Sequence, residues 1–108
     1  MKSRIMYIED KSNGLVGEAR IGRVTFSKSG KTIYYKGKSF KSLKGAGFKA
    51  NYYEVESGDE YWISGCKKDG TDRLVYARGL PIYIDEDVRE EYWTQIRKIP
   101  SKVGCEYA

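Results

Sequence analysis

Apolar and polar residues alternate with a period of two along much of the chain. Near residue 25, for example, Val24 and Phe26 alternate with Arg23 and Thr25. Such alternation is typical of a β-strand with one buried and one solvated face. The pattern predicts short strands at residues 5–8, 22–27, 32–35, 39–43, 52–56, 60–66, 72–77 and 81–84.

Glycine lies within the polar segments that separate most of these strands. Gly30, Gly37, Gly58 and Gly70 each occupy a segment of three or four residues. Glycine adopts the positive φ that tight hairpin turns require. We therefore expect a mainly β fold, either a small curved antiparallel sheet or a partly open barrel of the SH3-like or OB-like kind.

The pattern changes to a helical one near the C-terminus. Val88, Tyr92, Ile96 and Ile99 recur at spacings of four, four and three residues, which form one apolar stripe on a helix. Asp85 is a residue type that caps helices, and Pro100 cannot continue one. The sequence predicts a single helix at about 86–98 that packs on an end or an open face of the β structure.

The length of the chain suits one domain. We expect that domain to span residues 1–100, followed by a flexible tail at 101–108 where no periodicity remains. No apolar run approaches the roughly 18–20 residues that cross a bilayer, and charged residues from Glu9 onward interrupt any secretion signal. The sequence therefore predicts a cytoplasmic protein without a membrane partner, and it leaves the oligomeric state open.

The charges are distributed unevenly. Residues 1–50 carry a net charge of +9, and residues 51–108 carry −4, so the overall charge of +5 conceals a dipolar molecule. The segment from Ala19 to Tyr53 contains nine basic residues and no acidic one, with aromatic residues among them. A positive field of this kind attracts polyanions or acidic partners.

The basic segment predicts the candidate binding residues. On paired strands, lysines could follow phosphates while exposed rings stack on bases, which is how single-stranded nucleic acid is bound. The hypothesis assigns RNA or single-stranded DNA binding to Arg23, Lys28, Lys31, Tyr34, Lys36, Lys38 and Lys41.

Two alternatives to that hypothesis remain open. The protein could be an interaction module, such as an adaptor, an inhibitor or an immunity protein, that binds an acidic protein. The lysines could also serve only to keep edge strands soluble, with the acidic second half neutralising the basic face.

The sequence contains few side chains suited to catalysis. The chain has no histidine, which excludes Ser-His and Cys-His dyads. Cys66 and Cys105 cannot make a four-ligand zinc site and are expected to be reduced thiols, with a disulfide between them as the alternative. We expect no catalytic residues, metal or cofactor, and no enzymatic activity.

Three stretches of the chain resemble a family of short, uncharacterised bacterial proteins. They are YIEDK at 7–11, ARIGRVTFSKSGKT at 19–32 and YWISGCKKDG at 61–70, and the resemblance extends through the helix that contains Tyr92 and Trp93. The resemblance implies no catalytic or binding residues.

Members of that family sometimes carry the label of a deoxyxylulose-phosphate synthase. Such thiamine-diphosphate enzymes are much larger α/β assemblies with a Gly-Asp-Gly metal motif. This chain has only Gly58-Asp59-Glu60, in a predicted hairpin turn and without the Asn-Asn that would follow. The sequence therefore contradicts that label.

Overall fold

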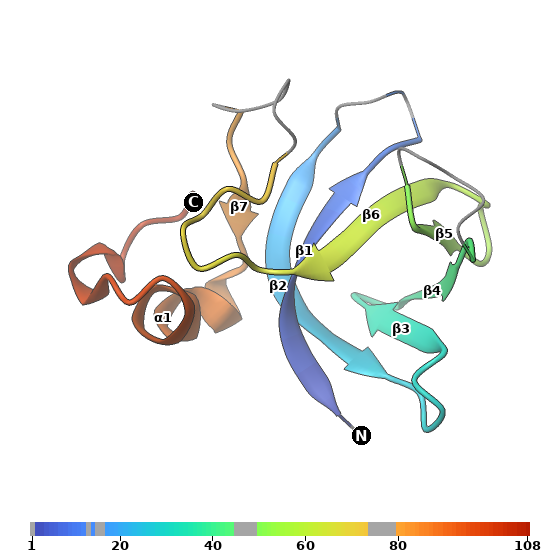
Figure 1. The fold of residues 1–108 in the computed structure, drawn as a ribbon, viewed down its shortest axis with the longest axis horizontal. Coiled ribbons are helices and arrows are strands. Elements are labelled where there is room, and N and C mark those ends of the chain that lie inside the picture. The colour runs from blue at the N-terminus through green and yellow to red at the C-terminus, as the bar shows by residue number, and fades with distance from the viewer. Residues whose placement is uncertain (1, 13, 15–16, 45–49, 74–79) are drawn as a thin grey trace.

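The structure is a computed structural model that describes residues 2–12, 14, 17–44, 50–73 and 80–108. The strands are β1 (Ser3–Asp10), β2 (Ala19–Phe26), β3 (Thr32–Tyr35), β4 (Lys38–Ser42), β5 (Tyr52–Glu54), β6 (Glu60–Gly65) and β7 (Tyr83–Ile84). One helix follows, from Glu86 to Ile96, with α1 (Arg89–Glu91) at its centre (Figure 1). A mainly β fold with a single C-terminal helix is therefore confirmed.

Strands β1 to β6 form a closed antiparallel barrel (Figure 1). Each strand pairs with its neighbours in the chain, and β1 closes the barrel by pairing with both β2 and β6. Tyr7, for example, lies opposite Ile21 on one side and Ser64 on the other. The barrel is thus closed and runs up and down in chain order, whereas an OB fold is a partly open Greek-key barrel.

Tight turns connect the barrel strands as the glycines indicate. Lys36 and Gly37 both have positive φ, +47° and +79°, so the β3–β4 hairpin has the two-residue turn whose twist matches that of its strands. The predicted strand at 72–77 lies mostly outside the described residues.

Two apolar clusters lie on opposite sides of β1 and β2. Met6, Ile8, Val24, Ile33 and Phe40 belong to the cluster inside the barrel. The second cluster lies outside it and joins β1, β2 and β7 to the helix; its buried residues are Ile5, Tyr7, Ala19, Ile21, Ile82, Ile84, Val88, Tyr92 and Trp93. Because β1 is buried on both faces, its sequence lacks clear alternation, and the predicted strand at 5–8 was shorter than the observed one.

The chain after the barrel adds a second layer to one side of it (Figure 1). Strand β7 pairs with β2 in parallel, with Arg20 opposite Tyr83 and Ile21 opposite Ile84. The helix then begins with a 3-10 turn at Glu86–Val88 and ends with a π turn at Tyr92–Ile96. It stops before the predicted residue 98, where Lys98 adopts a left-handed φ of +55°.

The expectation that Asp85 caps the helix is wrong. Its side chain makes no capping hydrogen bond. The carboxylate instead accepts hydrogen bonds from Arg20 and Tyr35 of the barrel. A local capping signal was overridden by partners that are distant in sequence.

The segment expected to be a flexible tail makes several contacts with the domain. Ile84 donates its backbone hydrogen to Glu106, and Ala108 donates to Ile82. The indole nitrogen of Trp93 donates to the carbonyl oxygen of Cys105 at 3.0 Å. These bonds place residues 105–108 beside β7.

The two cysteines are free thiols, Cys66 partly buried and Cys105 exposed. Within the described residues, none of the helical segments has the length and apolar character that crossing a bilayer requires.

Candidate functional site

Two hollows lie on either side of the turn that joins β2 to β3. The first, of about 760 Å³, is lined by Lys2, Ser3, Arg4, Phe26, Ser27, Lys28, Ser29 and Gly30. The second, of about 630 Å³, is lined by Ser29, Gly30, Lys31, Thr32, Lys41, Ser42, Lys44, Tyr52 and Tyr53. They share Ser29 and Gly30, and we call the combined surface the basic groove.

The β2–β3 turn positions the centre of this groove. The Ser27 hydroxyl accepts a hydrogen bond from the backbone of Thr32 at 3.1 Å, and the Ser27 backbone donates to the Thr32 carbonyl at 2.9 Å. Gly30 completes the turn with φ +78°. The hydrogen-bonded turn therefore holds Lys28 and Lys31 on opposite sides of one short loop.

The basic groove carries positive charge without compensation. Its lining includes six basic residues and no acidic one. The basic residues are Lys2, Arg4, Lys28, Lys31, Lys41 and Lys44. None of them forms an ion pair with another residue in the described part of the chain. The described lining of the groove thus combines basic side chains with serine and aromatic ones and contains no carboxylate.

Aromatic rings lie beside the lysines on the outer face of the barrel. Lys41 of β4 lies between Thr32 of β3 and Tyr53 of β5 in the strand pairing, so the three side chains share one face. Tyr34 is on the same face of β3, two residues beyond Thr32, and its side chain is 39% exposed. Both tyrosines are available to contact a ligand that follows Lys41.

The structure divides the seven predicted binding residues among three places. Lys28, Lys31 and Lys41 line the basic groove, and Tyr34 lies on the same outer face. Lys36 and Lys38 lie at the opposite end of the barrel. Arg23 points toward the helix, where its guanidinium forms an ion pair with Glu91 at 2.6 Å.

Four further residues of the groove were absent from the predicted set: Lys2, Arg4, Lys44 and Tyr53. Lys2 and Arg4 reach the groove because β1 pairs with the end of β2, where Phe26 donates a backbone hydrogen bond to Lys2. That pairing joins residues more than twenty positions apart, and no local pattern indicates it. Lys44 and Tyr53 could have been found, because both belong to the acid-free segment.

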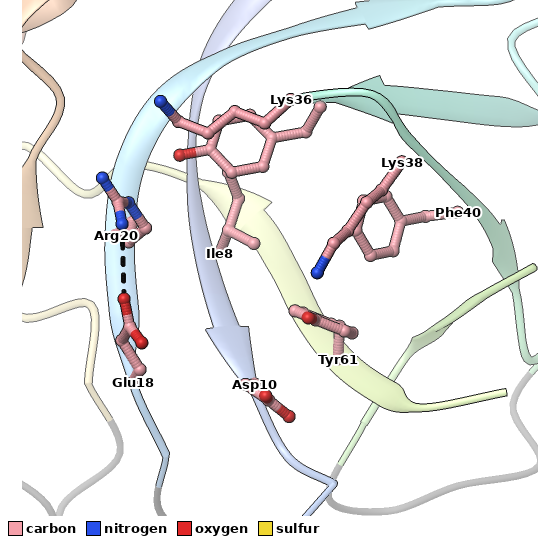
Figure 2. Close-up of a pocket in the computed structure, with 9 residues that line it drawn as sticks. Ile8, Asp10, Glu18, Arg20, Lys36, Lys38, Phe40 and Tyr61 are labelled. Atoms are coloured by element: carbon pink, nitrogen blue, oxygen red, sulfur yellow. Dashed lines mark hydrogen bonds and ion pairs between the residues drawn. The ribbon is translucent and has the colours of Figure 1, made fainter. Parts of the chain in front are cut away.

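A separate cavity of about 240 Å³ opens at the other end of the barrel, which we call the barrel mouth (Figure 2). Its lining consists of Ile8, Asp10, Glu18, Arg20, Tyr35, Lys36, Lys38, Phe40 and Tyr61. Lys38 faces this cavity because it lies two residues before Phe40 in β4 and therefore on the same face, and Phe40 is buried in the barrel. The barrel mouth thus combines apolar side chains with charges of both signs.

Asp85 organises one wall of the barrel mouth. Its Oδ1 accepts a hydrogen bond from Nε of Arg20 at 3.0 Å and also forms an ion pair with that guanidinium at 3.0 Å. Its Oδ2 accepts a hydrogen bond from the Tyr35 hydroxyl at 2.5 Å. Burial of the Tyr35 ring and this hydrogen bond to Asp85 raise the pKa of the Tyr35 phenol. The wall is therefore fixed by a buried carboxylate with defined partners.

A buried ionic cluster between the barrel and the 66–73 loop offers no comparable site. Glu9 forms ion pairs with Lys11 at 2.9 Å and with Arg73 at 3.4 Å, and it accepts the Tyr7 hydroxyl. All four side chains are nearly inaccessible to solvent. The described residues also include no cluster of three side chains that could hold a metal ion. We regard this cluster as structural.

Comparison of the chain with models of protein families, with curated proteins and with solved structures finds no match in any of the three. The basic groove and the barrel mouth are therefore the two candidate sites.

Proposed function

We propose that the protein is a non-enzymatic binding domain that holds single-stranded nucleic acid, either RNA or DNA, in the basic groove. The observation that carries this proposal is the set of six basic side chains around the β2–β3 turn that form no ion pair with another described residue, with no carboxylate in the described lining. Neutralising phosphates with such side chains releases counterions from the nucleic acid, which favours binding.

Tyr53 and Tyr34 support a single-stranded rather than a double-stranded ligand. A single strand can turn its bases toward an aromatic ring, and each stacked base contributes about 1–3 kcal/mol. Bases in a duplex are already stacked on one another and are not free to stack on these rings. Lys41 lies directly beside Tyr53, so one nucleotide could contact both side chains.

The proposal is tested by measuring the affinity for mixed-sequence oligonucleotides at several salt concentrations, by fluorescence anisotropy. If all six groove cations contact phosphates, the logarithm of affinity falls against the logarithm of salt with a slope of about −4, at about −0.7 per phosphate. A slope near zero, or no binding at low salt, would contradict the proposal.

Two variants with the same change in net charge distinguish binding in the groove from general electrostatic attraction. The double substitution Lys31→Gln and Lys41→Gln removes two cations from the groove. The control, Lys68→Gln with Lys98→Gln, removes two exposed cations that do not line the groove. We expect the first variant to reduce the magnitude of the slope by about 1.4 and the control to leave it unchanged. Equal effects of the two variants would exclude a specific groove.

An acidic protein partner is the alternative occupant of the same groove, and polyglutamate provides a probe for it. Tyr53→Leu together with Tyr34→Leu should weaken oligonucleotide binding by at least about tenfold through the loss of stacking. Polyglutamate has no bases, so its binding should not depend on the rings. Tighter binding of polyglutamate than of the oligonucleotide, with no effect of the ring substitutions, would favour the protein-binding alternative.

A further inference from the structure

The barrel mouth is a second pocket, remote from the basic groove. Its volume of about 240 Å³ is roughly eight times the ~30 Å³ that a water molecule occupies in the liquid, so it accepts a small organic molecule. Ile8, Phe40 and Tyr61 supply apolar side chains at its base, and the rings of Phe40 and Tyr61 pack edge to face with centroids 4.8 Å apart. The polar groups around this base determine which molecule fits.

Most charges around the barrel mouth already have partners within the protein. Arg20 forms ion pairs with Asp85 at 3.0 Å and with Glu18 at 3.3 Å, the second of which is drawn in Figure 2. Lys36 lies 3.7 Å from the other oxygen of Asp85. The two positive and two negative charges in these three ion pairs compensate one another, so they leave little net charge for a ligand.

Lys38 and Asp10 are the exceptions. Lys38 forms no ion pair with any described residue, although its amine interacts with the Tyr61 hydroxyl and with the more distant charge of Glu54. Among the described residues, Asp10 accepts side-chain hydrogen bonds from the backbone and hydroxyl of the neighbouring Ser12. Figure 2 shows the amine of Lys38 directed into the cavity, with Tyr61 between it and Asp10. The cavity therefore presents one cation and one anion on either side of Tyr61, and neither forms an ion pair with another described residue.

We propose that the barrel mouth binds a small zwitterion, a free α-amino acid with an apolar side chain. Its carboxylate pairs with Lys38, its ammonium group pairs with Asp10, and its side chain covers Ile8 and Tyr61. Charge complementarity favours a zwitterion over ligands that carry a single charge. A plain carboxylate would leave Asp10 unmatched in a partly desolvated cavity, and a plain amine would leave Lys38 unmatched in the same way.

The test is a titration followed by NMR chemical shifts of backbone amides, with three ligands of one shape. Leucine carries both charges, 4-methylpentanoate carries only the carboxylate, and 3-methylbutylamine carries only the ammonium group. We expect leucine to bind with a dissociation constant on the order of 1 mM and to shift amides around Lys38 and Asp10. Each single-charge analogue should bind at least about tenfold more weakly, because it lacks one charge-assisted contact.

Conservative variants test which residue pairs with the carboxylate of the ligand and which pairs with its ammonium group. Lys38→Gln should weaken leucine and 4-methylpentanoate, whereas Asp10→Asn should weaken leucine and 3-methylbutylamine. Lys41→Gln, on the outer face, should change none of the three and should weaken only oligonucleotides. Equal binding of leucine and 4-methylpentanoate with no effect of Asp10→Asn would overturn the proposal in favour of a simple anion site. An absence of shifts in the barrel mouth at about 50 mM ligand, far above the expected ~1 mM constant, would overturn it outright.

Discussion

Tyr35, the last residue of β3, donates its hydroxyl hydrogen to Oδ2 of Asp85, the residue that precedes the C-terminal helix, at 2.5 Å. The bond crosses strand β2 at Gly22, where the two side chains approach the backbone closely. Arg20, two residues before Gly22, binds the other oxygen of Asp85. This contact joins the barrel to the helical layer and forms the wall of the barrel mouth.

Gly22→Ala should therefore destabilise the fold. An added Cβ would lie 2.4 Å from Oδ2 of Asp85 and 2.6 Å from the Tyr35 ring, and both neighbours are held by hydrogen bonds. Overpacking of this kind costs about 1–3 kcal/mol. Urea denaturation measures the change. Gly104→Ala is the control, because its added Cβ meets no atom within 4 Å, and it should stay within about 0.5 kcal/mol of the original protein. Equal stability of the two variants would show that Asp85 and Tyr35 separate at no cost.

Alkaline pH should destabilise the protein through its buried phenols. Burial and a hydrogen bond to a carboxylate raise the pKa of both Tyr7 and Tyr35 above the ordinary 10.0. The folded state therefore retains these protons more tightly, and its extra stability is present below pH 10 and lost as the pH rises further. Above pH 10, each such group lowers the free energy of unfolding by about 1.4 kcal/mol per pH unit. Denaturation at successive pH values should show that Tyr35→Phe removes one such contribution, and an unchanged slope would contradict this account.

The two cysteines should differ sharply in their reaction with iodoacetamide. Burial raises the pKa of the Cys66 thiol to about 12, and the thiolate is the reactive form. Cys105 is exposed. At pH 8 in native buffer, mass spectrometry of the peptides should find Cys105 modified and Cys66 protected. In denaturant both should react. Modification of Cys66 at the rate of Cys105 in native buffer would show that the thiol is accessible.

Arg23→Gln should have a smaller effect on oligonucleotide affinity than Lys41→Gln. The Arg23 guanidinium is already paired with Glu91 at 2.6 Å and does not line the basic groove. Since both side chains of the pair are substantially exposed, its loss should cost at most about 1 kcal/mol of stability. Anisotropy titrations of the two variants at one salt concentration provide the comparison. An equal loss of affinity would place the ligand on β2 as well as in the groove.

The basic groove was only partly predictable from the sequence. Lys28, Lys31 and Lys41 could be identified because they occupy a glycine-containing turn and an alternating strand close to it. Lys2 and Arg4 could not, since their place beside Lys28 depends on the pairing of β1 with the far end of β2. The predicted Lys36 and Lys38 belong to the same basic segment as Lys41, but they lie in and just after the β3–β4 turn, at the other end of the barrel.

The mainly β fold, the β3–β4 hairpin and the presence of one C-terminal helix could all be predicted from the amino-acid sequence. These depend on side-chain alternation, on glycines at positive φ and on a helical stripe, which act over a few neighbouring residues. Barrel closure, the Arg23–Glu91 ion pair and the Tyr35–Asp85 hydrogen bond, by contrast, could be recognised only in the folded molecule. Each of them joins residues that are distant in sequence, and a local pattern carries no information about which distant partner is chosen.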